Sequence, residues 1–300
     1  MKRFVGVVAF VTALSSAAYA DGIPQGYSPS YQPFSWTGLY IGAHAGWEQK
    51  DIEGSDFVGG NYVPANDPFF FGFAPDSQEI EGWLGGGQFG YNHQFDRVVV
   101  GTELSGSWGD VDGNGNCFPG FQLGTPRDPT SSVSQTVNCN AKQDWTVQWL
   151  NKLGYAFGGE GRLLAYVTGG IAASELSINR SFTQTITQTR GADTSVTTQE
   201  VNWSGSQTFI GVVLGGGLQY AITDHISFGV EYLHAEYASG DITISGSDRN
   251  TSCFNGVCEP GRGGTQNFVG NVTDQFDTDT VRGVLNFKFG SRAEPVAVLK

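Results

Sequence analysis

The sequence predicts an all-β fold, an eight-stranded antiparallel up-and-down transmembrane β-barrel with four long outer loops. Three observations support this prediction. Apolar and polar residues alternate with period two in eight segments, short turns and long polar loops separate these segments in alternation, and 44 glycines stand beside 21 Phe, 11 Tyr and 7 Trp. Alternating segments of about ten residues are typical of strands that cross a membrane. A soluble β-sandwich would also alternate and is the alternative fold.

The first four segments each combine an apolar, aromatic-rich face with a polar face. Their apolar faces comprise Leu39, Ile41, Ala43, Ala45 and Trp47, then Trp83, Phe89 and Tyr91, then Val98, Val100, Leu104 and Trp108, then Trp145, Val147, Trp149, Leu153 and Tyr155. The opposite faces carry Tyr40, His44 and Glu48, then Gln88, Asn92 and Gln94, then Glu103, Ser105 and Ser107, then Gln148 and Lys152. Aromatic residues near strand ends are typical of the girdles at membrane interfaces, which favours the barrel over the sandwich.

The last four segments repeat this pattern. Their apolar faces comprise Ala165, Val167 and Ile171, then Ile210, Val212, Leu214, Leu218 and Tyr220, then Ile226, Phe228, Val230 and Tyr232, then Val281, Leu285, Phe287 and Phe289. The opposite faces carry Tyr166 and Thr168, then Gly211, Gly215, Gly217 and Gln219, then Ser227 and Glu231, then Arg282, Asn286 and Lys288.

The connections between the segments differ strongly in length. Short turns are expected at 96–97, 158–161 and 223–225, and long polar loops at about 51–78, 109–142, 177–205 and 239–275. Short turns at one end and long loops at the other are the arrangement of bacterial outer-membrane barrels. The barrel itself is expected over residues 36–290.

The two ends of the chain are expected to lie outside the barrel. Residues 1–20 have the basic start, short apolar run and small-residue end of a secretory signal peptide, with cleavage after Ala20. Residues 21–35 are expected to form a flexible N-terminal lead, and residues 291–300 are expected to form a periplasmic tail. The chain carries 16 Lys and Arg against 29 Asp and Glu. A net charge of -13 repels polyanions, so no nucleic-acid partner is expected.

The four cysteines fit export to an oxidising compartment and predict structural disulfides. Of the three pairings that four cysteines allow, the local one is favoured, because Cys117 and Cys139 share one polar stretch, and Cys253 and Cys258 another.

Several short motifs resemble one known family. Trp36-Thr37-Gly38-Leu39-Tyr40-Ile41-Gly42 is similar to the opening strand of the alphaproteobacterial small outer-membrane β-barrels, the porin-family or outer surface immunogenic proteins. Further similar motifs are Gly85-Gly86-Gly87-Gln88-Phe89-Gly90-Tyr91-Asn92, Leu164-Ala165-Tyr166-Val167-Thr168-Gly169-Gly170, Val230-Glu231-Tyr232 and Val281-Arg282-Gly283-Val284-Leu285-Asn286-Phe287-Lys288-Phe289. The resemblance covers about 36–290 and implies an OmpA-like eight-stranded barrel in the cell outer membrane of a Gram-negative bacterium. It also implies a surface protein, often immunogenic, with no shared enzymatic activity.

The candidate site is the barrel interior. An eight-stranded barrel is just wide enough for side chains to fill it, and charged residues of both signs fall on the inward face: Glu48, Glu103, Lys152, Glu231, Arg282 and Lys288. They predict either a polar plug or a narrow conduit for small solutes. The main hypothesis is therefore a surface barrel for membrane integrity and surface interaction, and the alternative is a small-solute porin.

Other functions find weaker support in the residues. His225 and Ser227 with Glu231 or Glu236 resemble an esterase set, but this His is expected at a periplasmic turn, so we expect no enzyme and no catalytic residues. No metal site and no cofactor are expected, since no histidine falls in a long outer loop where it could hold haem. The expected partners are outer-membrane lipid and lipopolysaccharide, with a host or environmental ligand at the outer loops.

Overall fold

The computed structural model describes residues 34–54, 57–63, 68–72, 77–115, 131–258 and 265–289. These residues belong to one compact unit, Pro33–Lys300. No helix formed by this part of the chain is long and apolar enough to cross a membrane. The expected signal peptide at 1–20, most of the expected lead at 21–35, the expected tail at 291–300 and Cys117 lie outside the described residues.

The described chain is made of strands. Their bounds are β1 Gly38–Gly54, β2 Phe57–Val63, β3 Pro68–Gly72, β4 Ser77–Phe95, β5 Val98–Gly115, β6 Ser131–Phe157, β7 Leu163–Arg190, β8 Asp193–Ala221, β9 Ile226–Phe254, β10 Val257–Cys258 and β11 Thr265–Lys288.

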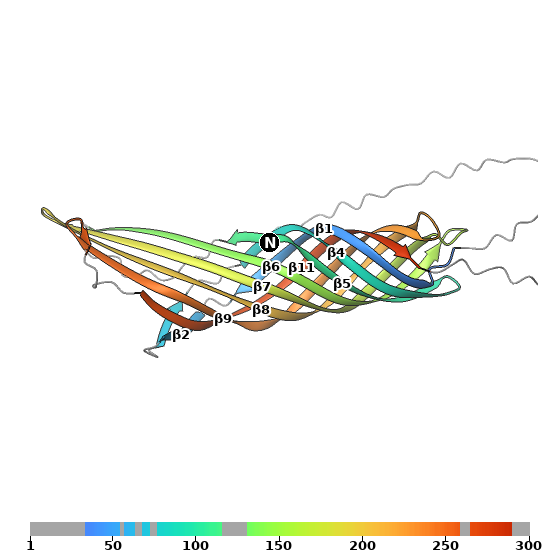
Figure 1. Cartoon of the computed structure of the whole chain (residues 1–300), viewed down its shortest axis with the longest axis horizontal. Coiled ribbons are helices and arrows are strands. Elements are labelled where there is room, and N and C mark those ends of the chain that lie inside the picture. The colour runs from blue at the N-terminus through green and yellow to red at the C-terminus, as the bar shows by residue number, and fades with distance from the viewer. Residues whose placement is uncertain are drawn as a thin grey trace, which may run out of the picture. The chain divides into compact units, whose positions relative to one another are not determined.

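Eight of these strands close into an antiparallel ring, which confirms the predicted barrel (Figure 1). The order around the ring is β1, β4, β5, β6, β7, β8, β9 and β11, and β11 returns to β1 with Tyr40 opposite Lys288. The three short strands extend this sheet: β2 pairs with β11, β3 with β2, and β10 with β9. Closing the ring satisfies the backbone groups that a sheet edge would leave unpaired in lipid.

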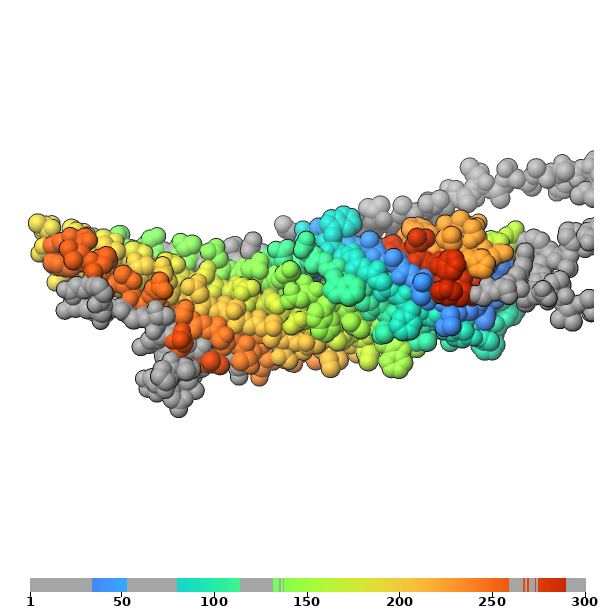
Figure 2. Space-filling view, in the orientation of Figure 1, coloured from blue at the N-terminus to red at the C-terminus, as the bar shows by residue number. Residues whose placement is uncertain are grey.

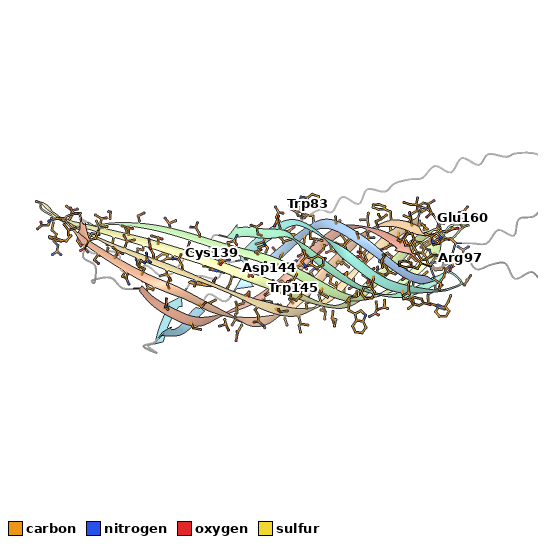
Figure 3. The ribbon with its side chains drawn as sticks, in the orientation of Figure 1. Trp83, Arg97, Cys139, Asp144, Trp145 and Glu160 are labelled. Carbon is orange, nitrogen blue, oxygen red and sulfur yellow. A yellow bond between two sulfur atoms is a disulfide. The ribbon has the colours of Figure 1, made fainter. Side chains whose placement is uncertain are left out.

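Period-two alternation places the predicted apolar faces toward the lipid. On β7, Val167 and Ile171 are 63% and 53% exposed, whereas Leu164, Tyr166 and Thr168 at positions of the opposite parity are buried. Trp83 points away from the barrel, and Arg97 and Glu160 lie together at the end with the short turns (Figure 3). At that end Asp96 adopts a φ of 55°, the left-handed conformation that Asp tolerates better than most residues.

The expected boundaries of the outer loops are wrong, because several strands continue through them. The range 177–205 contains the end of β7 and the start of β8, joined at Gly191 with a φ of 63°. Most of 239–275 belongs to β9 and β11, and much of 131–142 to β6. Figures 1 and 2 show β6–β9 running on past the ends of β1, β4 and β5.

Candidate functional site: the barrel lumen

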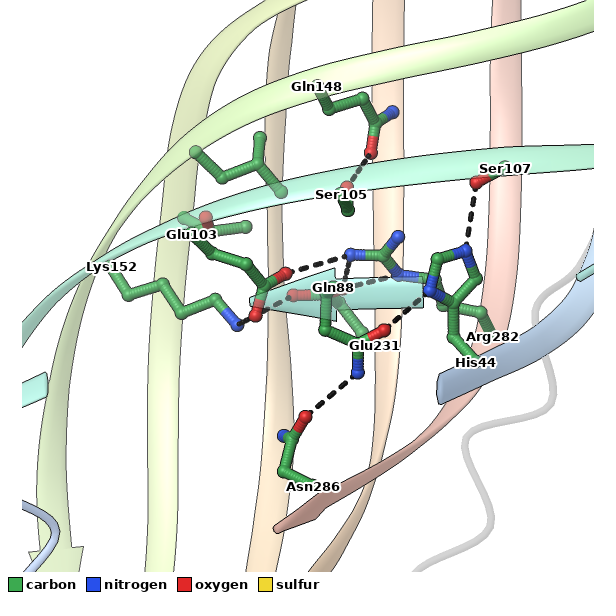
Figure 4. A network of polar contacts seen from close by, with 12 residues as sticks. His44, Gln88, Glu103, Ser105, Ser107, Gln148, Lys152, Glu231, Arg282 and Asn286 are labelled. Carbon is green, nitrogen blue, oxygen red and sulfur yellow. Dashed lines mark hydrogen bonds and ion pairs between the residues drawn. The ribbon is translucent and has the colours of Figure 1, made fainter. Parts of the chain in front are cut away.

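Four buried charges meet at the centre of the lumen (Figure 4). Lys152 Nζ lies 2.7 Å from Glu103 Oε2 and 3.8 Å from Glu231 Oε1. The Arg282 guanidinium reaches both carboxylates, with Nη2 2.5 Å from Glu231 and 3.4 Å from Glu103. The side chains of these two glutamates and of Arg282 are at most 1% exposed. Two cations and two anions give this central network no net charge, which is what a buried ionic group requires.

Strand register brings these four residues together from distant parts of the sequence. Glu231 on β9 lies directly opposite Arg282 on β11. On the other side of the ring, Lys152 on β6 pairs with Gly101, two residues from Glu103 on β5. Each carboxylate therefore has a cation on a neighbouring strand, and Arg282 links the two pairs across the lumen.

Two tyrosines complete the hydrogen bonding of the central network. Tyr40 donates its hydroxyl hydrogen to Glu103 Oε2 at 2.8 Å, and Tyr166 donates to Glu231 Oε1 at 3.1 Å. Lys152 Nζ also lies 5.0 Å from the centroid of the Tyr166 ring. Charge-assisted hydrogen bonds of this kind are stronger than neutral ones and fix the geometry of the carboxylates.

A second, uncharged chain of contacts lies beside the central network. His44 Nδ1 is 2.7 Å from Gln88 Oε1, and His44 Nε2 is 2.8 Å from Ser107 Oγ. Gln88 in turn donates through Nε2 to Asn286 Oδ1 at 2.8 Å. These residues come from four strands and cross-link the ring from inside.

Glycines on the inward face make room for the large side chains. A Cβ at position 90 would lie 2.5 Å from the Tyr40 hydroxyl, and a Cβ at position 217 would lie 2.7 Å from the Tyr166 hydroxyl. A Cβ at position 86 would lie 2.7 Å from His44 Nε2. Real Cβ atoms do not approach other heavy atoms this closely, so the space occupied by the network depends on these glycines.

An aromatic seal closes the lumen at the end with the short turns. Phe34 and Trp36, 8% and 3% exposed, pack against Val99, Leu164 and Tyr166. The Phe34 amide donates to the Glu160 carbonyl at 2.8 Å, and Trp36 Nε1 donates to the Gly161 carbonyl at 2.9 Å. Phe34 thus belongs to the barrel, although the sequence placed it in the flexible lead.

A largely apolar layer, which also holds the buried Lys50 against Phe276, fills the lumen on the other side of the central network. Leu150 lies two residues from Lys152 on β6, and Leu233 lies two residues from Glu231 on β9. The layer begins with these two leucines and continues to Ile242 and Phe276. These four side chains are at most 2% exposed. The central network therefore lies between two apolar layers.

Comparison with known proteins agrees with this architecture. The sequence model of the family described as outer membrane protein beta-barrel domain matches residues 6–256. The chain belongs to this family. It is 28% identical over 246 residues to the 31 kDa outer-membrane immunogenic proteins of Brucella melitensis and Brucella suis, an alignment that covers 76% of this chain and 84% of each relative.

Solved outer-membrane proteins are similar to the barrel as well. OprG from Pseudomonas aeruginosa is 15% identical with a TM-score of 0.38, and the match covers 87% of this chain and 99% of that one. The protease OmpT from Escherichia coli is 10% identical with a TM-score of 0.34, covering 87% and 100%. Family membership places this outer-membrane barrel in the lipid of the outer membrane of a Gram-negative bacterium.

The structure separates the six charges expected on the inward face of the outer-membrane barrel. Four of them form the central network. Glu48 lies apart from it and accepts a hydrogen bond from Thr280 Oγ1 at 2.9 Å. Lys288 lies at the seal, where its Nζ contacts the Ser35 carbonyl and lies 4.4 Å from the centroid of the Phe34 ring.

Lys50 is an inward charge that the sequence analysis missed. Its side chain is fully buried, and its Nζ lies 4.1 Å from the centroid of the Phe276 ring. The first segment was followed only to Glu48, but the alternation Tyr40, His44, Glu48 continues to Lys50 with the same parity. Reading that parity two residues further would have placed Lys50 in the lumen.

A cluster of one histidine and two aspartates lies on the outer face of the sheet, just beyond the apolar band. On β9 and β11 the run of exposed apolar residues ends at Tyr232 and Val281, and His234 and Asp279 lie at the next outward positions. His234 Nδ1 is 2.9 Å from Asp279 Oδ1. Because His234, Asp277 and Asp279 each have a ligand atom within 4.8 Å of the others, they have the spacing of a cation site. The Asp279 hydrogen bond raises the pKa of His234.

The cysteines that the structure describes are disulfide-bonded. Cys253 bonds to Cys258 across the hairpin between β9 and β10. Cys139 is also disulfide-bonded, and the pairing with Cys117 falls outside the described residues. In the part of the chain that the structure describes, no cysteine is free.

Proposed function

We propose that this outer-membrane barrel is a closed surface protein that contributes to membrane integrity and presents its outer strands to the surroundings. The observation that supports this function best is the charge-neutral central network, whose carboxylates and guanidinium are at most 1% exposed. A solute path through the ring would have to displace Arg282 from two carboxylates at once, leaving buried charges unpaired.

The two flanking layers support a closed lumen independently. A path would also have to cross the seal of Phe34 and Trp36 and the apolar layer that begins at Leu150 and Leu233. Apolar constrictions exclude water and ions by themselves. The aromatic seal, the central network and the apolar layer would each block a solute, and together they favour a plugged lumen over a narrow conduit.

We also propose that the barrel performs no turnover. The His225 Nδ1 of the suspected esterase set is 3.1 Å from the Lys288 carbonyl oxygen. Of the two acidic residues that could orient this histidine, Glu231 is instead bound by Arg282 Nε at 2.6 Å, and Glu236 lies 3.7 Å from His234. A catalytic base needs a partner that orients it toward its nucleophile, and the contacts here serve the barrel wall.

The partners follow from the position of each surface. The lipid-facing strands contact outer-membrane lipid, and the strands that continue beyond the apolar band reach into the layer of lipopolysaccharide. The relatives from Brucella are named immunogenic proteins, and we propose the same surface exposure for the outer end of this barrel.

Single-channel conductance in planar bilayers tests the closed state. The mature barrel, shown to be folded by heat-modified gel migration, is expected to give no discrete current steps. A reconstituted outer-membrane porin, measured in the same bilayers, shows that the assay detects an open lumen. Discrete steps in the wild type that disappear in Arg282→Gln would overturn the closed barrel in favour of a porin.

A further inference from the structure

A hollow lies among the strands that continue beyond the lumen core. Its volume is about 740 Å³, and its described lining comes from β6, β7, β8, β9 and β11. Five of these lining residues are asparagines and four are serines. Asparagine is disfavoured inside strands, so its concentration here departs from what the fold alone requires.

Strand register arranges the asparagines and serines in two parallel rows. The first row joins Asn140, Asn179, Ser204 and Ser245 as direct neighbours on β6, β7, β8 and β9. The second joins Asn138, Ser181, Asn202 and Ser247 on the same strands. We call these eight residues the amide–hydroxyl rows.

The rows lie on the outer face of the sheet. Asn179, Asn202 and Ser245 are exposed, and they alternate along their strands with buried residues such as Trp203 and Ile244. In a strand, neighbouring side chains point to opposite faces. The rows therefore face away from the barrel interior, toward whatever surrounds the protein.

The chemistry of the hollow suits an uncharged, hydroxyl-rich ligand. Carboxamides and hydroxyls both donate and accept hydrogen bonds, as sugar hydroxyls do. No Asp or Glu is among the described residues that line the hollow, although the chain has 29 of them. Among the described lining residues one is charged, Arg180, whose guanidinium lies 5.5 Å from the centroid of the Trp203 ring. The described lining is thus nearly uncharged on an acidic chain, and it offers a saccharide neutral hydrogen bonds.

The distance of the amide–hydroxyl rows from the membrane indicates which kind of saccharide surrounds them. On β9, the run of exposed apolar residues ends at Tyr232, thirteen residues before the first row at Ser245, and on β8 it ends at Ile210, six residues from Ser204. At about 3.3 Å per residue, these separations are roughly 40 Å and 20 Å along the strands, or about 15 to 30 Å above the band for tilted strands. At that height the outer leaflet presents sugar chains rather than lipid phosphates.

We propose that the amide–hydroxyl rows bind the polysaccharide chain of lipopolysaccharide in the same outer membrane. This proposal rests on the proposed surface function and names its partner. Two rows, each with two amides and two hydroxyls across four strands, offer an extended chain successive sites for hydrogen bonds.

The test is titration of the folded, full-length mature barrel with polysaccharide released by mild acid from lipopolysaccharide of the producing bacterium. Wild-type barrel is expected to bind it, and Asn179→Asp with Asn202→Asp to bind at least tenfold more weakly. The matched control, Gln207→Glu with Gln275→Glu, adds the same two charges at exposed positions outside the described lining of the hollow and is expected to bind as the wild type does. If the double aspartate variant does not fold, Ser245→Asp replaces it.

Three results would overturn the proposal: no binding by folded wild type, an equal loss in the control variant, or equal affinity for dextran. The conductance experiment stays separate from this one. A barrel that is silent but binds no polysaccharide refutes only the proposed partner, and a barrel that conducts yet binds polysaccharide refutes only the closed lumen.

Discussion

Removing Arg282 is the sharpest test of how the lumen is held together. Its guanidinium lies 2.5 Å from Glu231 and 3.4 Å from Glu103, and its side chain is 1% exposed. In Arg282→Met the two carboxylates keep only Lys152, so one negative charge remains uncompensated inside the ring. Breaking a buried ion pair in this way costs about 3–5 kcal/mol. We expect a loss of that size in the free energy of unfolding.

A charge-balanced double variant separates lost charge compensation from lost packing. In Arg282→Met with Glu231→Gln, Glu103 and Lys152 remain paired at 2.7 Å, and no net charge is left behind. We therefore expect the double variant to be more stable than Arg282→Met alone, with a coupling energy of at least about 2 kcal/mol.

Urea unfolding of the barrel in lipid vesicles, followed by tryptophan fluorescence and heat-modified gel migration, measures both quantities. Arg190→Met, at the exposed tip of β7, is the matched control and should change stability by less than about 0.5 kcal/mol. If Arg282→Met costs no more than this control, or if the two substitutions simply add, the central network does not stabilise the barrel as argued.

Three further predictions concern the seal, the glycines and the rim. Trp36→Ala should cost about 3–5 kcal/mol in urea unfolding, because it empties the buried seal, and a loss below 1 kcal/mol would show that the seal is loose. Gly217→Ala should cost about 1–3 kcal/mol because its Cβ would lie 2.6 Å from the Val230 carbonyl oxygen and 2.7 Å from the Tyr166 hydroxyl, and unchanged stability would contradict the tight fit. Since Asp279 raises the pKa of His234, this pair stabilises the fold below the ordinary histidine pKa and loses that effect as the pH rises through the raised value. Both side chains are more than a third exposed, so we expect the pair to contribute less than about 1 kcal/mol to the free energy of unfolding. Urea unfolding of wild type and His234→Gln at pH 5 and pH 9 measures this contribution, and the same pH dependence in both proteins would refute the assignment.

The barrel was predictable from sequence where the two faces differ strongly in polarity. Val167 and Ile171 against Tyr166 and Thr168 give a clear period of two, and the structure follows it. Beyond the membrane the outward face becomes polar, and on β7 from Ser181 to Arg190 only Phe182 and Ile186 are apolar. The apolar, aromatic-rich outward face that marks the membrane segments is missing there, so these strands were taken for loops.

The charged residues that face the lumen were predictable, but the ion pairs that they form were not. Parity places Glu103, Lys152, Glu231 and Arg282 on the inward face. Which of them meet depends on the register of β9 against β11 and on the stagger of the strands around the ring, and neither is written in any one segment. Glu48 and Lys288 have the correct parity as well, yet they lie at other heights in the lumen.

The inward glycines explain why the lumen is both full and ordered. An eight-stranded ring has a fixed width, so each large inward side chain needs a small residue near it. Tyr40 has Gly90, Tyr166 has Gly217, and the tyrosines in turn hold the carboxylates of the central network. Enlarging a glycine would therefore displace a tyrosine, and displacing a tyrosine would release a buried carboxylate from one of its donors. Because these steps are linked, the barrel cannot open at one residue without disturbing the next, and a closed lumen follows from the same residues that fill it.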